Sequence, residues 1–549
     1  MPKLTIDERE VVVHNGATIL DAAEKLGIEI PTMCFLTGHE ATTSCMVCVV
    51  KVRDSDNLVP ACGTIAEDGM RVQSNSEEVH QARKAALELL LSDHVGDCMG
   101  PCQVACPAHM NIPLMIRQIS AGKLRDAIAT VKRDIALPAV LGRICPKPCE
   151  RVCRRAVFDE AVSICLLKRY VANVDLESAD PHLPVCKPAR GKQVAIVGAG
   201  PTGLAAAYYL QQEGYDCTVF DEHEEPGGML RYAVSQQQLP RDVLEKEIAL
   251  IKKLGVKFQG LTRIGTALSM DVLRRDFDAV FVAIGQLKPD DAGRIGLETN
   301  QNGIAINAKT YEASLPGVFA GGDAVRNPRR FDLPAAASCG ARRSGKQERS
   351  SGGAVRAVAD GKEAAVSISQ YLSGQTVTGL TKPFNTRVGK LKDGEIERFV
   401  ARVSQAPRVT PSQKDCGFTD AQACEEAARC LCCDCRKAEN CKLRRYAQEY
   451  GARPGRYKGE RRVFVQHLQH PDVVYEPGKC IDCGLCIKIA AGAGEELGLT
   501  FVGRGFDVRV AVPFDRSMAE ALSHAANQCV AACPTGALAF KDRSQIEDR

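Results

Sequence analysis

The sequence lacks several features that would place it in common functional classes. It contains no tryptophan, and only 5% of its 549 residues are aromatic. Proteins that bind single-stranded nucleic acids stack the bases on such side chains, so this scarcity argues against that function. The formal net charge of +4 is small for this length and gives no strong attraction to nucleic acid or anionic membranes. No run of about eighteen apolar residues is present, so no segment is expected to span a bilayer.

The N-terminal stretch MPKLTIDEREVVV lacks the basic, apolar and small-residue regions of a signal peptide, and we expect a cytoplasmic protein. The chain is too long for one hydrophobic core, which predicts about three to five domains. The cysteine content is the unusual feature, because the chain contains 26 cysteines. Because the cytosol is reducing, clustered thiols there are expected to hold metal or to carry out redox chemistry rather than to form disulfides.

The first cysteine group has the pattern Cys34-x10-Cys45-x2-Cys48-x13-Cys62. Four thiolates, two of them in a tight C-x2-C loop, suit a two-iron cluster. Zinc is the alternative, although zinc ribbons usually carry two such pairs. The spacing and the preceding hairpin and helix resemble the N-terminal [2Fe-2S] domain of the large iron–sulfur subunit of respiratory complex I and of related hydrogenase subunits. The resemblance covers residues 1–75 and implies a β-grasp ferredoxin fold.

The second group follows a helix that is predicted to begin at Ser76. Its seven members are Cys98, Cys102, Cys106, Cys145, Cys149, Cys153 and Cys165. Prolines after Cys106 and Cys145 stop the local helix, and two interleaved four-iron clusters fit this arrangement. The block resembles the N-terminal domain of the glutamate synthase small subunit and of dihydropyrimidine dehydrogenase. That resemblance implies that one cluster is bound by Cys106, Cys145, Cys149 and Cys153.

The other cluster of this block would keep Cys98 and Cys102, and two residues are candidates to complete it. His94 stands in an H-x3-C step that resembles the histidine ligand of the complex I subunit. Its alternative is an ordinary solvated polar residue. Cys165 is the second candidate, and its alternative is a small buried apolar residue.

The third group is the stretch RCLCCDCRKAENC at residues 429–441. Cys430, Cys433, Cys435 and Cys441 supply four ligands and leave Cys432 over. A disulfide inside so tight a loop would be strained, and a zinc site is possible. In the company of the other groups a [4Fe-4S] cluster is favoured, with the ligand set left open.

The fourth group is Cys480-x2-Cys483-x2-Cys486-x46-Cys533. A C-x2-C-x2-C loop with a remote Cys-Pro is a strong signal for a four-iron cluster. The long gap and the stretch CPTGAL resemble a cluster domain of the complex I subunit. Six cysteines remain outside every group and are expected to be structural: Cys186, Cys217, Cys339, Cys416, Cys424 and Cys529.

A dinucleotide fingerprint begins at residue 193, where a predicted strand runs into Gly198-x-Gly200-Pro201-x-Gly203. The first glycine makes the tight turn, the second admits a pyrophosphate, and the third packs helix against strand. The helix N-terminus then faces the phosphates. Asp221, at the end of the next predicted strand, is the candidate for the ribose hydroxyls, with Glu222 as the alternative.

Two further stretches favour FAD as the nucleotide. LPGVFAGGDAV, with Gly322 and Asp323, resembles the second flavin motif of two-dinucleotide-domain reductases, in which the aspartate meets the ribityl chain. EEPGGML, which contains Gly228, resembles the glutamate synthase small subunit. No second G-x-G-x-x-G occurs in the chain, which predicts that the NAD(P)H-binding domain of that family is missing. The polar, glycine- and serine-rich stretch 341–353 is expected to be a surface loop. The overlapping charged run 329–349 is expected to be a solvated loop, with phosphate binding as the alternative.

These motifs predict a multidomain α/β and α+β protein. The expected domains are a [2Fe-2S] domain at 1–75, a helical two-cluster domain at 76–185, a Rossmann-like FAD domain at 186–380 and a ferredoxin-like region with two [4Fe-4S] clusters at 381–549. They favour an electron-transfer subunit that links FAD, one [2Fe-2S] and about four [4Fe-4S] clusters.

The expected partners are a flavin- and NADH-binding subunit, a hydrogenase, a formate dehydrogenase or a similar catalytic subunit. A self-contained NAD(P)H-dependent reductase and a zinc-rich scaffold are the alternatives. No acid–base catalytic residue is predicted.

Overall fold

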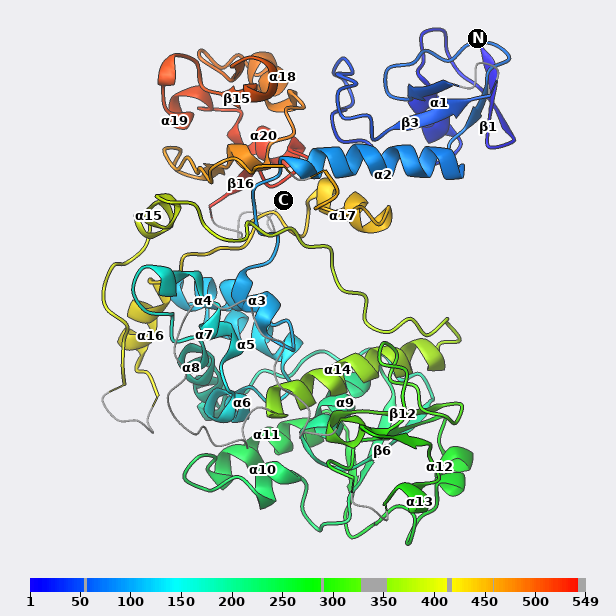
Figure 1. The fold of residues 1–549 in the computed structure, drawn as a ribbon, viewed down its shortest axis with the longest axis vertical. Coiled ribbons are helices and arrows are strands. Elements are labelled where there is room, and N and C mark those ends of the chain that lie inside the picture. Colours follow the sequence, from blue (N-terminus) through cyan, green and yellow to red (C-terminus); the bar gives the residue numbers. More distant parts are fainter. Residues whose placement is uncertain (54–56, 288–290, 327–352, 412–416, 458, 542–549) are drawn as a thin grey trace. The chain divides into compact units, whose positions relative to one another are not determined.

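Figure 1 shows the computed structural model of the chain, which describes residues 1–53, 57–287, 291–326, 353–411, 417–457 and 459–541. The chain forms two compact units. Unit 1 consists of Met1–Gly100, Pro383–Arg402 and Cys433–Arg549, and unit 2 consists of Pro101–Lys382 and Val403–Cys432. Unit 1 is thus interrupted twice by segments of unit 2. The division into four consecutive domains stays a prediction.

Unit 1 begins with a five-stranded sheet in the order β2-β1-β5-β3-β4. Its first hairpin pairs Leu4 with Val11, and β1 runs parallel to β5. Helix α1 (Ile19–Lys25) begins at a capping box, in which the Thr18 side chain accepts a hydrogen bond from the backbone of Asp21. The strands are β1 (Lys3–Ile6), β2 (Arg9–Val12), β3 (Val49–Val52), β4 (Asn57–Pro60) and β5 (Arg71–Gln73).

Helix α2 (Glu77–Ser92) starts at Ser76, whose side chain accepts a hydrogen bond from the backbone of Val79, as the sequence predicted. The helix packs against α17 (Lys442–Glu449), which lies more than 300 residues later in the same unit. The buried Arg83 joins the two by donating a hydrogen bond of 2.9 Å to the Tyr450 hydroxyl. Segments from both ends of the chain therefore share one core.

The first part of unit 2 is helical. Prolines occupy the first turn of α4, α6 and α7, where the missing backbone N–H costs nothing. Helices α6 and α8 pack closely, and the buried Glu247 accepts hydrogen bonds from the backbone of Ala139 and Val140 at the start of α6. The helices are α3 (Pro101–Ala105), α4 (Ile112–Ser120), α5 (Leu124–Asp134), α6 (Pro138–Ile144), α7 (Pro148–Arg151) and α8 (Ile164–Glu177).

The second part of unit 2 contains a parallel sheet in the order β12-β9-β6-β7-β8. Its strands read as apolar runs because parallel sheets are covered on both faces. Helices α9 (Pro201–Gln212) and α14 (Gly353–Leu372) pack tightly against each other (Figure 1). The strands are β6 (Gln193–Val197), β7 (Asp216–Phe220), β8 (Lys257–Gln259), β9 (Ala279–Val282) and β12 (Val318–Ala320).

Smaller elements complete unit 2. The helices are α10 (Met229–Tyr232), α11 (Arg241–Lys253), α12 (Met270–Asp276), α13 (Asp291–Ile295) and α16 (Asp420–Ala427). A short hairpin joins β10 (Thr299–Asn300) and β11 (Gly303–Ile304). The fold is therefore multidomain α/β with a Rossmann-like parallel sheet.

The C-terminal part of unit 1 surrounds helices α18 (Leu485–Gly492) and α20 (Ala526–Ala532), which pack against each other. Two small antiparallel sheets flank them: β13 (Val473–Tyr475) with β16 (Leu538–Phe540), and β14 (Thr500–Val502) with β15 (Arg509–Ala511). Helices α15 (Glu395–Val400) and α19 (Met518–Ala521) complete the set. Of the helices in the described ranges, none combines the length and apolar character that a membrane crossing requires.

The contact between α9 and α14 depends on a glycine. A Cβ atom at Gly361 would lie 2.3 Å from the carbonyl oxygen of Thr202 and 2.9 Å from the Cβ of Ala205. We expect Gly361→Ala to lower the stability of unit 2 by about 1–3 kcal/mol, because the two helices must move apart. Thermal unfolding measures the effect.

Gly353, on the same helix, is the matched control because a Cβ atom there meets nothing within 4 Å. Gly353→Ala should leave stability unchanged or raise it by about 0.4–1 kcal/mol. Equal melting temperatures for the two variants would contradict the close-approach argument.

Candidate functional site

The four cysteines of the first group are all buried and lie together beside the N-terminal sheet. The Sγ atoms of Cys48 and Cys62 are 3.4 Å apart. Hydrogen bonds from the partner thiols lower the pKa of Cys34 to about 5 and that of Cys48 to about 7, whereas the same pairings raise the pKa values of the partners Cys45 and Cys62. Thiolates are the form that binds iron, so each pair offers one thiol that ionises readily and one that must lose its proton when iron binds.

The loop that carries three of these cysteines turns sharply. Thr43 and Met46 have φ values of 54° and 53°, in the left-handed region that few side chains adopt. Cys62 comes directly after β4 on the other side of the site. Strained loop residues beside a candidate binding site are typical of functional positions. The residues present fit a two-iron cluster held by four thiolates.

A second group in unit 1 lines one cavity and contains His94, Cys98, Cys435 and Cys441. The Nδ1 atom of His94 is buried and has no hydrogen-bond partner among the described residues. Burial, together with the charge of Lys479, lowers the pKa of His94 to about 3, so the imidazole is neutral and can act as a ligand. Three thiols and a neutral imidazole form a mixed ligand set that an iron–sulfur cluster accepts.

This grouping differs from two expectations. His94 and Cys98 lie together as predicted, but Cys102 belongs to unit 2. Cys435 and Cys441 lie with His94 and Cys98. The sequence had predicted that these two cysteines share a cluster with Cys430 and Cys433 instead. The physical reason is that the chain leaves unit 1 after Gly100 and enters it for the last time at Cys433, so ligands far apart in the sequence become neighbours.

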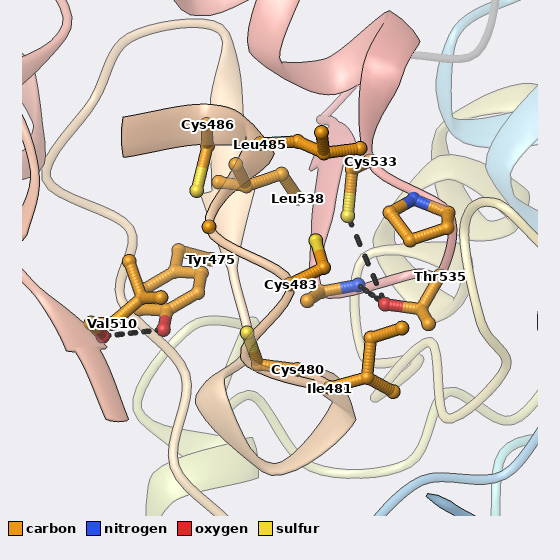
Figure 2. Close-up of a pocket in the computed structure, with 13 residues that line it drawn as sticks. Tyr475, Cys480, Ile481, Cys483, Leu485, Cys486, Val510, Cys533, Thr535 and Leu538 are labelled. Atoms are coloured by element: carbon orange, nitrogen blue, oxygen red, sulfur yellow. Dashed lines mark hydrogen bonds between the residues drawn. The ribbon is translucent and has the colours of Figure 1, made fainter. Parts of the chain in front are cut away.

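The fourth sequence group lies around a single pocket, whose lining includes Cys480, Cys483, Cys486 and Cys533 (Figure 2). Gly484, with φ of 72°, precedes helix α18 and lets the loop turn between two of the cysteines. The Thr535 hydroxyl donates a hydrogen bond of 2.8 Å to the carbonyl of Lys479 and holds the Cys-Pro segment against the loop. The remaining lining is mainly apolar, which excludes water.

In unit 2, the thiol of Cys165 is hydrogen-bonded to those of Cys145 and Cys149. Burial alone would lower the pKa of the enclosed Lys168. The thiols of Cys165, Cys145, Cys149 and Cys106 raise it overall, so all four lie close to this one ammonium group.

The structure therefore places Cys165 in the group that was expected to contain Cys153. The reason is that α8 brings Cys165 back onto α6, whereas Cys153 lies beyond the end of α7.

The remaining cysteines of the opening stretch separate. Cys430 is hydrogen-bonded to the Cys432 thiol and lies close to Cys102, all within unit 2. Cys432 was the one cysteine of this stretch that the predicted ligand set did not include. The signal that could have identified it is the positive φ of 48° at Cys432, which turns neighbouring thiols in different directions, but this is a property of the folded loop.

The cysteines outside every group behave in several ways. Cys217 and Cys529 are buried, whereas Cys186 and Cys424 are exposed. Cys339, Cys416 and the stretch 341–352 lie outside the described residues. Within the described ranges, no group of three or more histidine, cysteine, aspartate or glutamate side chains is arranged to hold a single metal ion.

The flavin-type fingerprint folds as predicted from strand β6 into helix α9. Gly198 has φ of 106°, and a Cβ atom there would lie 2.4 Å from the carbonyl of Ala283. A Cβ atom at Gly203 would overlap the carbonyl of Gly198. Gly200 is different, because nothing lies within 4 Å of a Cβ atom built there. The open space at Gly200 is where a pyrophosphate can approach the helix N-terminus.

Two distant segments converge on this helix end. A Cβ atom at Gly228 would lie 2.7 Å from Cα of Gly200, and one at Gly322 would lie 2.5 Å from the Thr202 hydroxyl. Asp323 follows Gly322 and is an exposed residue. The residues from both predicted flavin motifs therefore meet where a nucleotide would lie.

Asp221 directly follows β7 and is held by hydrogen bonds from neighbouring backbone groups. Its Oδ2 atom accepts a hydrogen bond of 2.6 Å from the backbone of Ala199, and its Oδ1 atom accepts one of 2.9 Å from the backbone of His223. The carboxylate therefore supports the glycine turn and stands at the strand end expected for a ribose-binding acid. Glu222, the alternative, forms an ion pair with Arg263 instead.

Two cysteines, one on α18 and one on α20, test which thiols hold iron. Cys486 lines the pocket in Figure 2, whereas the Cys529 thiol donates to the carbonyl of Cys486 and is absent from the lining. We expect Cys486→Ser to lose the iron and sulfide of one cluster and its EPR signal, because serine is a poor ligand for iron. Iron analysis and EPR of the reduced protein measure this.

The matched control is Cys529→Ser, which should keep the full iron content. Equal losses in the two variants would show that the loss comes from general disruption of this region.

Comparisons with known proteins identify domains in three regions of the chain. Residues 2–77 match the model of a 2Fe-2S iron–sulfur cluster binding domain, and residues 73–179 match dihydropyrimidine dehydrogenase domain II with a 4Fe-4S cluster. Residues 174–341 match the pyridine nucleotide-disulphide oxidoreductase domain. These matches confirm the predicted resemblances for the N-terminal, helical and flavin-type regions.

Several curated proteins resemble this region of the chain. The NADP(+)-dependent formate dehydrogenase subunit beta of Moorella thermoacetica is 39% identical over 239 residues, which cover 40% of this chain and 32% of that protein. The NADPH-Fe(3+) oxidoreductase subunit beta of Geobacter sulfurreducens is 40% identical over 208 residues, or 37% of this chain and 31% of that protein.

The glutamate synthase [NADPH] small chain of Bacillus subtilis is 35% identical over 207 residues, or 36% of this chain and 42% of that protein. The chain thus spans less than half the length of each relative.

Proposed function

We propose that the chain is an electron-transfer subunit of a multi-subunit oxidoreductase in the cytoplasm. It would pass electrons between FAD, a [2Fe-2S] cluster and several [4Fe-4S] clusters, and link NAD(P)H- or ferredoxin-level carriers to a partner catalytic subunit. The observation that carries this proposal is the convergence of separate cysteine groups in a chain that also builds a flavin-type phosphate cradle.

The proposed ligands follow the groups of the structure. Cys34, Cys45, Cys48 and Cys62 would hold the two-iron cluster in a β-grasp ferredoxin fold. The proposed four-iron sites are His94 with Cys98, Cys435 and Cys441; Cys106 with Cys145, Cys149 and Cys165; and Cys480 with Cys483, Cys486 and Cys533. The proposed flavin contacts are Gly198, Gly200, Pro201, Gly203, Asp221, Gly228, Gly322 and Asp323.

A flavin supplies the exchange between two-electron and one-electron carriers that a series of clusters requires. The chain's own residues position and insulate these groups. The N-terminus of α9 and the open face of Gly200 would bind the pyrophosphate, and the apolar lining around the cysteines keeps water from the thiolates. Asp221 supports the glycine turn through its bond to Ala199.

The segment between β9 and β12 supports a relay without its own nicotinamide site. In the reductases that it resembles, a second dinucleotide domain enters there. Here the described residues of that segment form only α13 and the β10–β11 hairpin. The names of the Moorella and Geobacter relatives, each a subunit beta of an oxidoreductase, support a partner such as a formate dehydrogenase. A hydrogenase and an NADH-binding subunit are the other proposed partners.

The test is an anaerobic titration of the reconstituted single chain with NADH and then NADPH, followed by dithionite, with flavin absorbance as the readout. We expect no bleaching with either nucleotide and full bleaching with dithionite. Rapid stoichiometric bleaching by a nucleotide would instead establish a self-contained reductase. Zinc without sulfide in the purified protein would favour a structural scaffold.

A glycine variant tests the flavin cradle separately. Gly200→Ala places a methyl group in open space, so the fold should remain intact while FAD binding weakens by about tenfold or more, because the pyrophosphate can no longer approach the backbone. Flavin retained after gel filtration measures this.

Gly293→Ala is the control, since a Cβ atom there also meets nothing within 4 Å but lies far from the fingerprint in sequence. Full flavin retention in both variants would argue against a dinucleotide at Gly200.

A further inference from the structure

Four cysteines of the clustered sequence groups lie in unit 2 and belong to none of the sites above. They are Cys102 at the start of the helical part, Cys153 beyond α7, and Cys430 and Cys432 near the end of the unit. Each is partly buried. The regions that match family models end at residue 341, so they do not include Cys430 or Cys432.

We propose that Cys102, Cys153, Cys430 and Cys432 form a further four-iron cluster site, assembled from three separate segments of unit 2. This proposal rests on the proposed electron-transfer function and adds a cluster to it. Four thiolates meet the usual ligand requirement of a [4Fe-4S] cluster.

Electrostatic interactions link three of the four. The thiol of Cys432 is hydrogen-bonded to that of Cys430, and a charge on Cys102 acts on Cys430. Between the first two, Leu431 is buried, and the positive φ of 48° at Cys432 reverses the backbone. This turn presents two nearby thiols on one side of the loop.

Cys153 reaches the same place through helix packing. Helix α7, which precedes Cys153, packs against α3, which carries Cys102. Cys102, Cys153 and Cys430 all pack against the large hydrophobic core of unit 2. Two residues after Cys153, the guanidinium of Arg155 donates hydrogen bonds of 2.7 Å to the carbonyls of Ser404 and Arg429. The backbone before Cys430 is therefore tied directly to the backbone after Cys153.

A buried ionic network fastens this connection. Arg155 and Arg429 are fully buried and share the carboxylate of Asp159, at 2.7 Å and 3.1 Å. Arg429 also pairs with the buried Glu426 at 2.9 Å. Glu426 in turn accepts a hydrogen bond of 2.7 Å from the backbone of Ser163, at the start of α8. Buried charges persist only when they are paired in this way.

A second pair extends the same network. Arg408 binds Glu150 of α7 at 2.9 Å and the Ser163 hydroxyl at 2.7 Å. Helix α16, which leads to Cys430, also packs against α4 and α8 (Figure 1). The returning segment is thus held at many points against the helices that carry Cys102 and Cys153. A ligand pair delivered from a remote segment needs such rigid support.

Serine variants test the site in the full, reconstituted chain. Cys430→Ser and Cys432→Ser should each lose about four iron atoms and the matching sulfide, and both should lose the same EPR signal of the dithionite-reduced protein. Cys102→Ser and Cys153→Ser should remove that signal as well. Flavin content should stay at the wild-type level, which shows that unit 2 is folded.

Two controls come from the same stretch of chain. Cys424→Ser changes an exposed thiol on α16, and Cys433→Ser changes the thiol next to Cys432. Both should keep the full iron content. Loss of iron in Cys433→Ser but not in Cys432→Ser would overturn the ligand set, and full iron in all four ligand variants would overturn the site.

The failure of this proposal is distinct from failure of the proposed function. If the wild-type chain holds no iron after reconstitution, both the electron-transfer function and this cluster site are overturned. If the wild-type chain holds clusters and all their EPR signals persist in the Cys430 and Cys432 variants, only this cluster site is overturned.

A measurement on the wild-type chain tests the same site without any variant, and so does not depend on whether the serine variants fold. Alkylation of the cluster-loaded protein under anaerobic conditions should label Cys424 and spare the partly exposed Cys432. Removal of the clusters by oxidation with a chelator should then make Cys432 reactive. Labelling of Cys432 at the same rate before and after cluster removal would overturn the site.

Discussion

The constraint on which the rest of this structure depends is that an iron–sulfur cluster needs several ligands around one point, while the chain can deliver only one or two from any short segment. Closing a loop over a long sequence separation costs entropy, although that cost grows slowly with length. The proposed sites meet this constraint in different ways. The C-x2-C-x2-C loop brings three thiols from one turn, whereas the other groups depend on segments that return from far along the chain.

The interruption of unit 1 follows from the same constraint. The chain first leaves unit 1 after Gly100, two residues after Cys98, returns to it for Pro383–Arg402, and re-enters it again at Cys433, just before Cys435. The cavity that contains His94 therefore has two candidate ligands before the first departure and two after the last return. Binding a cluster there would hold together the two ends of the span within which unit 2 is built.

Buried cations accompany the gathered thiols. Lys168 lies among four cysteines of unit 2, and in unit 1 Lys479 lies near Cys435 and Cys98, with Glu476 as its ion-pair partner. Lys437 donates a hydrogen bond of 2.6 Å to the carbonyl of Cys533. An ammonium group in a water-poor interior acts strongly on nearby negative charge. These lysines compensate the thiolates, and they are placed to influence the reduction potential of any cluster bound there.

Much of this protein was determined by local sequence. The glycine fingerprint predicted the turn from β6 into α9, because each of its glycine positions leaves no room for a side chain once a dinucleotide is bound. The Ser76 cap and the pocket of Cys480, Cys483, Cys486 and Cys533 followed from short-range patterns in the same way.

Only the tertiary structure decided which remote thiols meet. Cys165 rather than Cys153 joins Cys145, because the packing of α8 on α6 sets that neighbour. Cys430 and Cys435, five residues apart in sequence, belong to different units because the chain crosses from one unit to the other between them. Spacing along the chain predicts ligands that share a loop, but ligands from separate segments are fixed by the packing of helices and by buried ion pairs, which no local pattern encodes.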